Sequence, residues 1–306
     1  GIDALYRHQA RAIEALRQGE DVVLATPTAS GKSLVYALPA LEACLRDPEA
    51  RTLLLFPLRA LEQDQRKKLE ADLLALALPH GVPRPRVAVY DGDTADSERR
   101  KIRANPPNLL ISTPDMLHLG LLPHHESWSR FFAGLRFVVI DELHSYRGVF
   151  GSHVAQLLRR LDRVARHHGA APRLVCTSAT IANPGEHAAN LTGRSFTVVE
   201  SDGAARAQRH VLLLNPSGSP YTAAAKLFRM AVRRGLRTIA FTKARRVTEL
   251  LHSWIQAAEP GLARRISSYR AGFLPEERRE IERKLFDGDL LGVISTSALE
   301  MGIDVG

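Results

Sequence analysis

Short apolar runs recur along the first two thirds of the chain, separated from one another by segments of helix length. The runs are Val22–Ala25, Leu53–Phe56, Val87–Tyr90, Leu109–Ser112, Phe137–Ile140, Leu174–Thr177 and Phe196–Val199. Continuous apolar runs with this spacing are typical of strands buried on both faces of a mostly parallel sheet. A helix is expected at Ser152–Arg166, where an apolar stripe has helical spacing. The pattern therefore predicts one α/β domain over residues 1–200.

A polar stretch interrupts this pattern near residue 200, and the alternation restarts beyond it. Residues 201–209 lack apolar periodicity and are expected to form a linker. Residues 210–306 are expected to form a second α/β domain, with its last helix ended by Gly288. We expect this domain to be incomplete and the chain to be a fragment, because no helix or strand follows Gly306. The strands predicted in it are Val211–Leu214, Thr238–Phe241, Ile266–Tyr269 and Gly292–Thr296.

The stretch from Ala25 to Ser33 has the features of a phosphate loop, because it follows a predicted buried strand and precedes a predicted helix. In that context the backbone N–H groups of a tight loop and the positive end of the helix point at one place. Lys32 is predicted to reach the β- and γ-phosphates of a nucleotide, and the Ser33 hydroxyl to hold Mg²⁺. Thr26 stands where the full motif has its first glycine, so an ordinary helix start remains an alternative for this stretch alone.

An acidic pair, Asp141 and Glu142, directly follows the predicted strand Phe137–Ile140. Ligands of open α/β sheets bind beyond the carboxyl ends of the strands, which is where this pair falls. Asp141 is predicted to hold Mg²⁺ through water, and Glu142 to act as the base that orients or deprotonates an attacking water. A helix N-cap would also explain the pair taken alone. Together with Lys32, however, the pair favours a site that hydrolyses a nucleotide.

The composition adds an expected partner and compartment. The 306 residues carry a net charge of +9, and residues 201–306 hold 17 Lys and Arg against 11 Asp and Glu. This excess favours a polyanionic partner such as nucleic acid, with a generically basic surface as the alternative. Cys44 and Cys176 lie in apolar segments, as core residues in a reducing compartment do. No apolar run approaches the ~20 residues of a membrane span and no signal-peptide pattern is present, so we expect a cytoplasmic protein without a membrane partner.

The order and spacing of these motifs resemble those of the superfamily 2 helicases, with Asp141-Glu142-Leu143-His144 as the acidic box. The resemblance covers nearly the whole chain. It implies two RecA-like domains, ATP with Mg²⁺ on the first domain, and single-stranded nucleic acid as the partner. The residues it assigns to the nucleotide are Tyr6 and Gln9 at the adenine, Thr28, Ala29, Ser30 and Gly31 in the phosphate loop, and Asp304. The residues it assigns to coupling are His144, Ser178 and Thr180, and those it assigns to the nucleic-acid strand are Arg59, Thr113, Thr242 and Thr296.

Within that superfamily, the segment from Asp141 to Val154 is similar to the bacterial MrfA (YprA-like) DNA repair helicases and their fungal Hrq-type relatives. This similarity implies ATP-driven 3′→5′ translocation on single-stranded DNA with duplex unwinding. Two departures bear on this expectation. The family's last motif, which supplies an arginine finger, is expected just past Gly306, so this fragment is expected to bind ATP and hydrolyse it poorly. The zinc-binding cysteines of the relatives have no match in two separated cysteines, so Mg²⁺ is the one metal expected.

Three alternatives to a DNA helicase stay open. An RNA helicase would use the same chemistry, because phosphate contacts do not distinguish the sugar. A nucleic-acid-binding module with little ATP turnover is favoured by the absent last motif and disfavoured by Lys32, Asp141 and Glu142. A P-loop metabolite kinase is disfavoured by the second α/β domain. The sequence leaves open the polarity, the strand-separating element, the pathway and lesion, and the oligomeric state.

Overall fold

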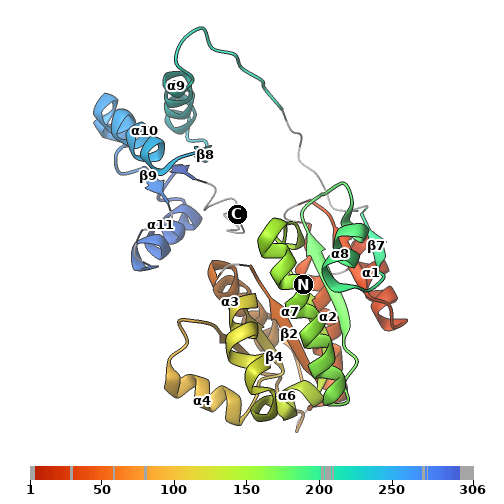
Figure 1. Ribbon diagram of the computed structural model, residues 1–306. Helices are drawn as coiled ribbons and strands as arrows, with labels where there is room; N and C mark the ends of the chain where they lie inside the picture. Colours follow the sequence, from red (N-terminus) through yellow and green to blue (C-terminus); the bar gives the residue numbers. More distant parts are fainter. Residues whose placement is uncertain are drawn as a thin grey trace. The chain divides into compact units, whose positions relative to one another are not determined.

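The computed structural model describes residues 4–27, 30–57, 59–78, 81–200, 203, 208, 210–270, 273 and 275–296. It divides into two compact units, residues 1–206 and 207–306, each with a sheet of its own (Figure 1). Of the predicted linker 201–209, residues 203 and 208 fall within the described part of the chain. The α/β class is confirmed for both units.

The first unit is built on a seven-stranded parallel sheet in the order β3-β4-β2-β5-β6-β1-β7. Each of the seven strands expected in residues 1–200 is confirmed, with its ends within two residues of the prediction. The strands are β1 (Val22–Ala25), β2 (Arg51–Leu55), β3 (Val87–Tyr90), β4 (Leu109–Ser112), β5 (Leu135–Ile140), β6 (Arg173–Ser178) and β7 (Thr197–Val199).

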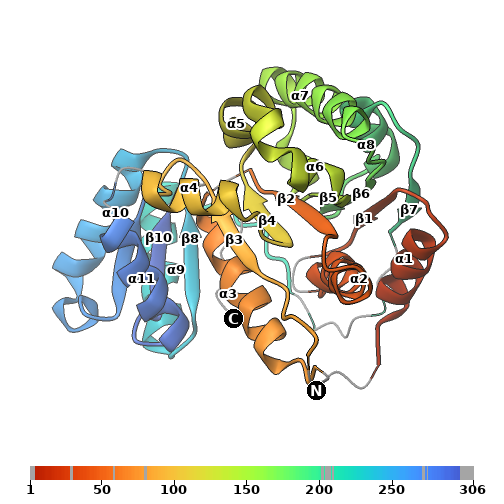
Figure 2. The same ribbon diagram turned by 90° about the horizontal axis from the view of Figure 1, so that it is seen from below.

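Helices cover both faces of this sheet, which explains why its strands are apolar throughout. In β2, Leu54 packs toward one face while Leu53 and Leu55 pack toward the other, as the two-residue period of a strand requires. Figure 2 shows α7 and α8 on one side of the sheet and α1 and α2 on the other. The first face, toward which Leu54 packs, is covered by α1 (Arg7–Arg17), α2 (Ser33–Arg46) and α3 (Arg59–Ala75). The second face, toward which Leu53 and Leu55 pack, is covered by α4 (Asp96–Ala104), α6 (Ser129–Ala133), α7 (Gly148–His167) and α8 (Pro184–Thr192).

Short helical turns join β4 to β5 on the second face. They are α5 (Pro114–Met116), η1 (Leu117–Leu121) and η2 (Leu122–Trp128). Their apolar side chains, with Trp128 fully buried, pack in the same core cluster as α7. The predicted helix Ser152–Arg166 is confirmed as the central part of α7.

The second unit has a three-stranded parallel sheet in the order β8-β10-β9. In β10, Ile294 packs with α9 and α10, while its neighbour Val293 packs with α11 on the other face. Gly288 follows α11 with a φ of +84°, as its predicted role in ending that helix requires. The elements are α9 (Pro220–Arg233), β8 (Thr238–Phe241), α10 (Arg245–Ala258), η4 (Pro260–Leu262), β9 (Ile266–Tyr269), α11 (Pro275–Asp287) and β10 (Gly292–Ser295).

The predicted strand Val211–Leu214 is wrong. This run has no regular structure, and its side chains are exposed, Leu213 to 95%. A strand forms only where a neighbour accepts its hydrogen bonds, and β8 at the edge of the sheet pairs with β10 alone among the described strands. An apolar run that has no strand to pair with therefore does not form a strand here.

Two further sequence expectations concern the core and the membrane. Cys44 and Cys176 are buried and unbridged, as expected for small core residues. Among the described residues, none of the helices combines the length and the apolar character that a bilayer span needs.

Candidate functional site

Three neighbouring strands of the first unit end at the same place. The sheet order puts β6 between β1, which leads into the predicted phosphate loop, and β5, which leads into Asp141 and Glu142. Carboxyl ends of parallel strands lie at one edge of a sheet, so two motifs a hundred residues apart in sequence meet around the end of β6. The predicted nucleotide residues of the two motifs are thereby brought together.

The phosphate loop is held in shape by side chains from its own base and from α1. Thr26, at the position of the missing glycine, is buried, and its hydroxyl lies 2.7 Å from that of Ser30. Buried His8 places Nε2 2.9 Å from the Ser30 carbonyl oxygen. Gly31 has a φ of +73°, and its carbonyl accepts a 3.0 Å bond from the Gln9 amide. An added Cβ at Gly31 would lie 2.5 Å from that amide nitrogen, so this position accepts only glycine without rearrangement.

Lys32 lies across the loop and donates to the carbonyl oxygens of Thr26 and Pro27, at 3.1 and 3.0 Å. Burial lowers the pKa of its ammonium, and the carboxylates of Glu142 and Asp141 oppose that shift, so the three charges interact. Ser33 begins α2, and its hydroxyl accepts a 2.9 Å bond from the Lys68 ammonium on α3. A cationic group thus already lies beside the hydroxyl predicted to hold Mg²⁺.

Asp141 is held by two donors at the end of β5. The Thr177 hydroxyl, on β6, donates to its Oδ1, and the backbone N–H of Glu142 donates to the same oxygen at 2.8 Å. Burial raises the pKa of the Asp141 carboxyl, while these two bonds and the Lys32 charge act in the opposite direction. Two donors fix the orientation of the carboxylate, as a metal ligand needs.

Glu142 combines a strained backbone with a perturbed carboxyl. Its φ of +51° makes it the one non-glycine residue in the described part of the chain with a positive φ. Burial, with the Asp141 charge in second place, raises the pKa of Glu142 from 4.5 to about 7, against the effect of Lys32. A carboxyl with a pKa near neutrality is suited to general-base work. Strain of this kind costs about 1–3 kcal/mol and is concentrated at functional sites.

His144 connects the acidic pair to β6. Its Nδ1 lies 3.3 Å from Glu142 Oε2 and 3.4 Å from the Ser178 hydroxyl. Burial lowers the pKa of His144, with the Arg147 and Lys32 charges acting in the same direction. Two of the three predicted coupling residues, His144 and Ser178, therefore touch, while Thr180 is exposed two residues beyond β6.

Of the other residues assigned to the nucleotide, Gln9 lies in the first turn of α1 and Tyr6 directly precedes that helix. Gln9 is buried between the backbone N–H of Tyr6, at 2.9 Å, and the Gly31 carbonyl, while the Tyr6 ring is half exposed and stacks on His8. Thr28, Ala29 and Asp304, also assigned to the nucleotide, lie outside the described residues.

The four residues assigned to nucleic acid follow strand ends of both units. Thr113 follows β4 and caps α5, with its hydroxyl accepting from the Met116 N–H at 3.3 Å. Thr242 follows β8, and its hydroxyl lies 2.6 Å from that of Thr248. Thr296 follows β10, and Arg59 begins α3, where its side chain falls outside the described part.

Sequence reasoning missed two residues of the site. His8 braces the phosphate loop, and Thr177 donates to Asp141. His8 stands between Tyr6 and Gln9, so a polar side chain at a position of α1 that packs inward was the available signal. Thr177 had no signal of its own, because its role depends on β6 lying beside β5.

The comparisons with known proteins agree on one family. The model of the DEAD/DEAH box helicases matches residues 6–187. The ATP-dependent helicase YprA of Bacillus subtilis is 44% identical over 318 residues, which cover 100% of this chain and 42% of YprA. The ATP-dependent helicase HRQ1 of Saccharomyces cerevisiae is 39% identical over 319 residues, covering 98% of this chain and 29% of HRQ1. The chain thus spans less than half the length of these curated relatives.

A solved structure gives the same answer in three dimensions. The crystal structure of the helicase MrfA bound to DNA and AMPPNP superposes with a TM-score of 0.91 at 42% identity, covering 100% of this chain and 43% of MrfA. The resemblance to MrfA, YprA and Hrq-type helicases is therefore confirmed. With its family match spanning the phosphate loop and the acidic pair, the chain belongs to the DEAD/DEAH box helicase family.

Proposed function

We propose that this chain is the motor of an ATP-dependent DNA helicase. One observation carries the proposal: the end of β6 contacts both halves of the site. The Ser178 carbonyl accepts from the Thr26 N–H at 3.3 Å, the Thr177 hydroxyl donates to Asp141, and the Ser178 hydroxyl lies by His144. The relatives support the assignment, since YprA and HRQ1 are named ATP-dependent helicases and the structure of MrfA was solved with DNA and AMPPNP bound.

ATP would be held by the phosphate loop with Lys32 on its phosphates. The residues present fit Mg²⁺ as well, because the Ser33 hydroxyl and the Asp141 carboxylate are hard oxygen ligands. The Lys68 ammonium, which donates to the Ser33 hydroxyl, would have to leave that oxygen. Bound there, Mg²⁺ would neutralise charge on the β- and γ-phosphates. For Lys32 to reach them, its ammonium must leave the carbonyls of Thr26 and Pro27.

Glu142 is the base in this mechanism. Its carboxyl, with a pKa near 7, accepts a proton from the attacking water, and its αL backbone fixes where that carboxyl points. Asp141 is assigned to the metal instead, because the donors Thr177 and the Glu142 N–H stabilise its ionised form and orient it through Oδ1.

Coupling of ATP hydrolysis to domain movement is assigned to His144 and Ser178, with Thr180 two residues beyond Ser178. Hydrolysis changes the charge beside Glu142, and His144 lies between that carboxyl and β6. A side chain with two partners can exchange one for the other as the nucleotide state changes, which is how a local event shifts a two-state element.

The strand is proposed to be single-stranded DNA, contacted at its phosphates by Arg59, Thr113, Thr242 and Thr296. Hydroxyls and a guanidinium at strand and helix ends make sequence-independent phosphate contacts. DNA is favoured over RNA by the DNA in the MrfA structure. The 3′→5′ direction and a role in DNA repair are likewise proposals, and so is a cytoplasmic location, which the two unbridged thiols support.

The test measures binding and turnover on the same protein. MgATP binding and ATP hydrolysis are followed with single-stranded DNA, single-stranded RNA or no nucleic acid, for the unchanged chain, Lys32→Ala, Glu142→Gln and the exposed-lysine control Lys67→Ala. We expect Lys32→Ala to lose ATP binding, Glu142→Gln to keep binding and lose turnover, and Lys67→Ala to change neither. DNA should tighten ATP binding or speed hydrolysis more than RNA does. Equal effects of the Lys32 and Lys67 variants would refute the site, and a response to RNA alone would show an RNA helicase.

A further inference from the structure

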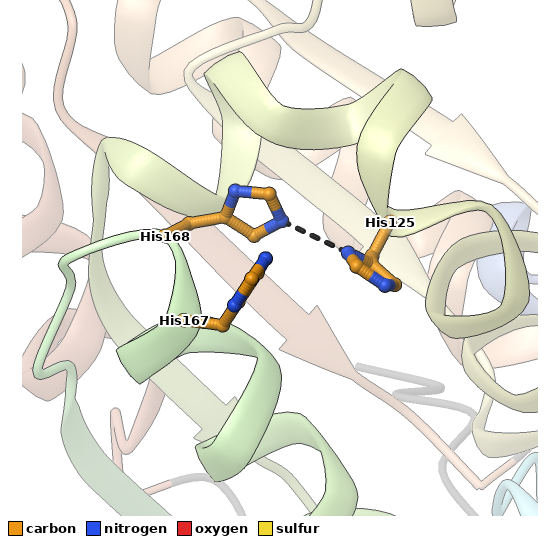
Figure 3. Close-up of side chains that lie close together, drawn as sticks. All are labelled: His125, His167 and His168. Carbon is orange, nitrogen blue, oxygen red and sulfur yellow. Dashed lines mark hydrogen bonds between the residues drawn. The ribbon is translucent and has the colours of Figure 1, made fainter.

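Three histidines converge on the face of the first unit that carries α7. His125 lies in η2, His167 is the last residue of α7, and His168 follows it. Each offers a ring nitrogen, and these three atoms lie within 4.8 Å of one another. Figure 3 shows the rings of His167 and His168, at the end of α7, turned toward that of His125. Within the described part of the chain, none of the site residues discussed above belongs to this cluster.

The distances match those between the ligands of a tetrahedral metal. His125 Nδ1 lies 3.1 Å from His168 Nε2. Glu126 supplies a fourth atom, with Oε1 3.5 Å from His125 Nδ1 and 3.6 Å from His167 Nε2. Zinc bonds of 2.0–2.1 Å at tetrahedral angles separate two ligand atoms by about 3.3 Å. The three ring nitrogens form a mutually close set, and the Glu126 carboxylate lies against two of the three histidines.

A hydrogen bond between two imidazoles would account for His125 and His168 alone. It does not account for His167, whose ring lies edge-on to the rings of both His125 and His168. The ring of His168 is also fixed, since it stacks on Phe132 at 5.8 Å with an angle of 11° between planes.

The cluster is remote from the nucleotide. Helix α7 begins at Gly148, just after the acidic box, and its 20 residues span about 30 Å to His167. A metal here would tie η2 to the end of α7. It would thereby fix the helical turns between β4, which ends beside Thr113, and β5, which ends at Asp141.

We propose that His125, His167 and His168, with Glu126, bind one divalent transition-metal ion of the zinc class. Imidazole and carboxylate ligands in a four-coordinate set suit Zn²⁺, and Co²⁺ fits the same geometry. The role is structural, because the cluster joins η2 to the end of α7 and contains none of the nucleotide-site residues.

The test uses the untagged chain after removal of metals by a chelator. Zn²⁺ is titrated in competition with a chromogenic chelator, and Co²⁺ is followed by the visible absorption that tetrahedral coordination intensifies. His125→Gln removes one ligand. His167→Gln removes another at a side chain that is 63% exposed, so its folding is not at risk. The matched control is His124→Gln, an exposed histidine next to His125 in η2.

We expect one Zn²⁺ per chain and a tetrahedral Co²⁺ spectrum. Both ligand variants should weaken Zn²⁺ binding by at least about 100-fold, because loss of an outer-shell partner alone costs 10–100-fold. The His124 variant should bind as the unchanged chain does. Absence of stoichiometric binding, an octahedral Co²⁺ spectrum, or equal losses in the His124 and His167 variants would overturn the proposal.

Discussion

Glu142→Gln is expected to stabilise the first unit at pH 8 and to stabilise it much less at pH 5. The folded protein raises the pKa of Glu142 from 4.5 to about 7, chiefly through burial. The folded state therefore binds a proton more readily than the unfolded state between these two values. Stability falls as the pH rises through that window, and above it the ionised carboxylate is a fixed cost. An amide of the same shape carries no such cost.

The size of the effect follows from the two pKa values. One pKa unit corresponds to 1.36 kcal/mol, so a rise from 4.5 to about 7 amounts to about 3 kcal/mol. The side chain is 21% exposed, so solvent screening removes little of this. We expect a gain of about 3 kcal/mol at pH 8. At pH 5 the carboxyl is protonated in the folded state but still largely ionised in the unfolded state, so the gain should fall to about 1 kcal/mol, and it should approach zero only as the pH falls to about 4.

Urea unfolding at the two pH values measures this difference. Trp128 is buried in the first unit and Trp254 lies in the second, so a Trp254→Phe background makes Trp128 fluorescence report the first unit. The control is Glu98→Gln on the exposed side of α4, for which we expect a change within about 0.5 kcal/mol at either pH. An equal effect of Glu142→Gln at pH 5 and pH 8 would refute the view that burial of the charge makes Glu142 a poised base.

Three further predictions test neighbouring parts of the structure. Thr177→Val removes the donor to Asp141 and should raise the Mg²⁺ concentration for half-maximal nucleotide binding about 10–100-fold, whereas Thr177→Ser should restore it; an unchanged Mg²⁺ titration would contradict the role of this bond. Gly31→Ala should cost about 1–2 kcal/mol in urea unfolding for its positive φ alone, and adding Gln9→Ala should recover only the part due to the close contact with the Gln9 amide; full recovery would mean that the backbone is not strained. Leu213→Ser should change stability by less than about 0.5 kcal/mol, because the side chain is 95% exposed, and a loss above about 2 kcal/mol would show that Val211–Leu214 is a buried strand after all.

The strands of the first unit were predictable because a strand that is buried on both faces is recognisable from its own sequence. A run such as Val22–Ala25 must be apolar at every position, whatever its neighbours are. The sheet order leaves no such signature, since it depends on which strands pair. Val211–Leu214 shows the limit, because the same apolar signature occurs there without a partner strand.

The candidate site was predictable where chemistry and spacing coincide. Lys32 and Ser33 at a helix start, and Asp141 and Glu142 after a strand, are recognisable because each residue type has a specific task. Contacts that cross the sheet were not predictable. Thr26 looked like a defect in the phosphate loop, yet its hydroxyl bonds Ser30 and replaces the missing glycine by a different means.

The position of β6 explains why the phosphate loop and the acidic pair form one site. Its last two residues make three contacts: the Ser178 backbone holds Thr26 in the phosphate loop, the Ser178 hydroxyl lies by His144, and the Thr177 hydroxyl holds Asp141. A displacement of the phosphate loop must therefore act on the residue that also lies beside His144. Because parallel strands have their carboxyl ends at one edge, a single strand between β1 and β5 suffices to connect the residues proposed to bind phosphate, to bind the metal and to act as the base. Ser178 thus contacts the phosphate loop on one side and, through His144, Glu142 on the other.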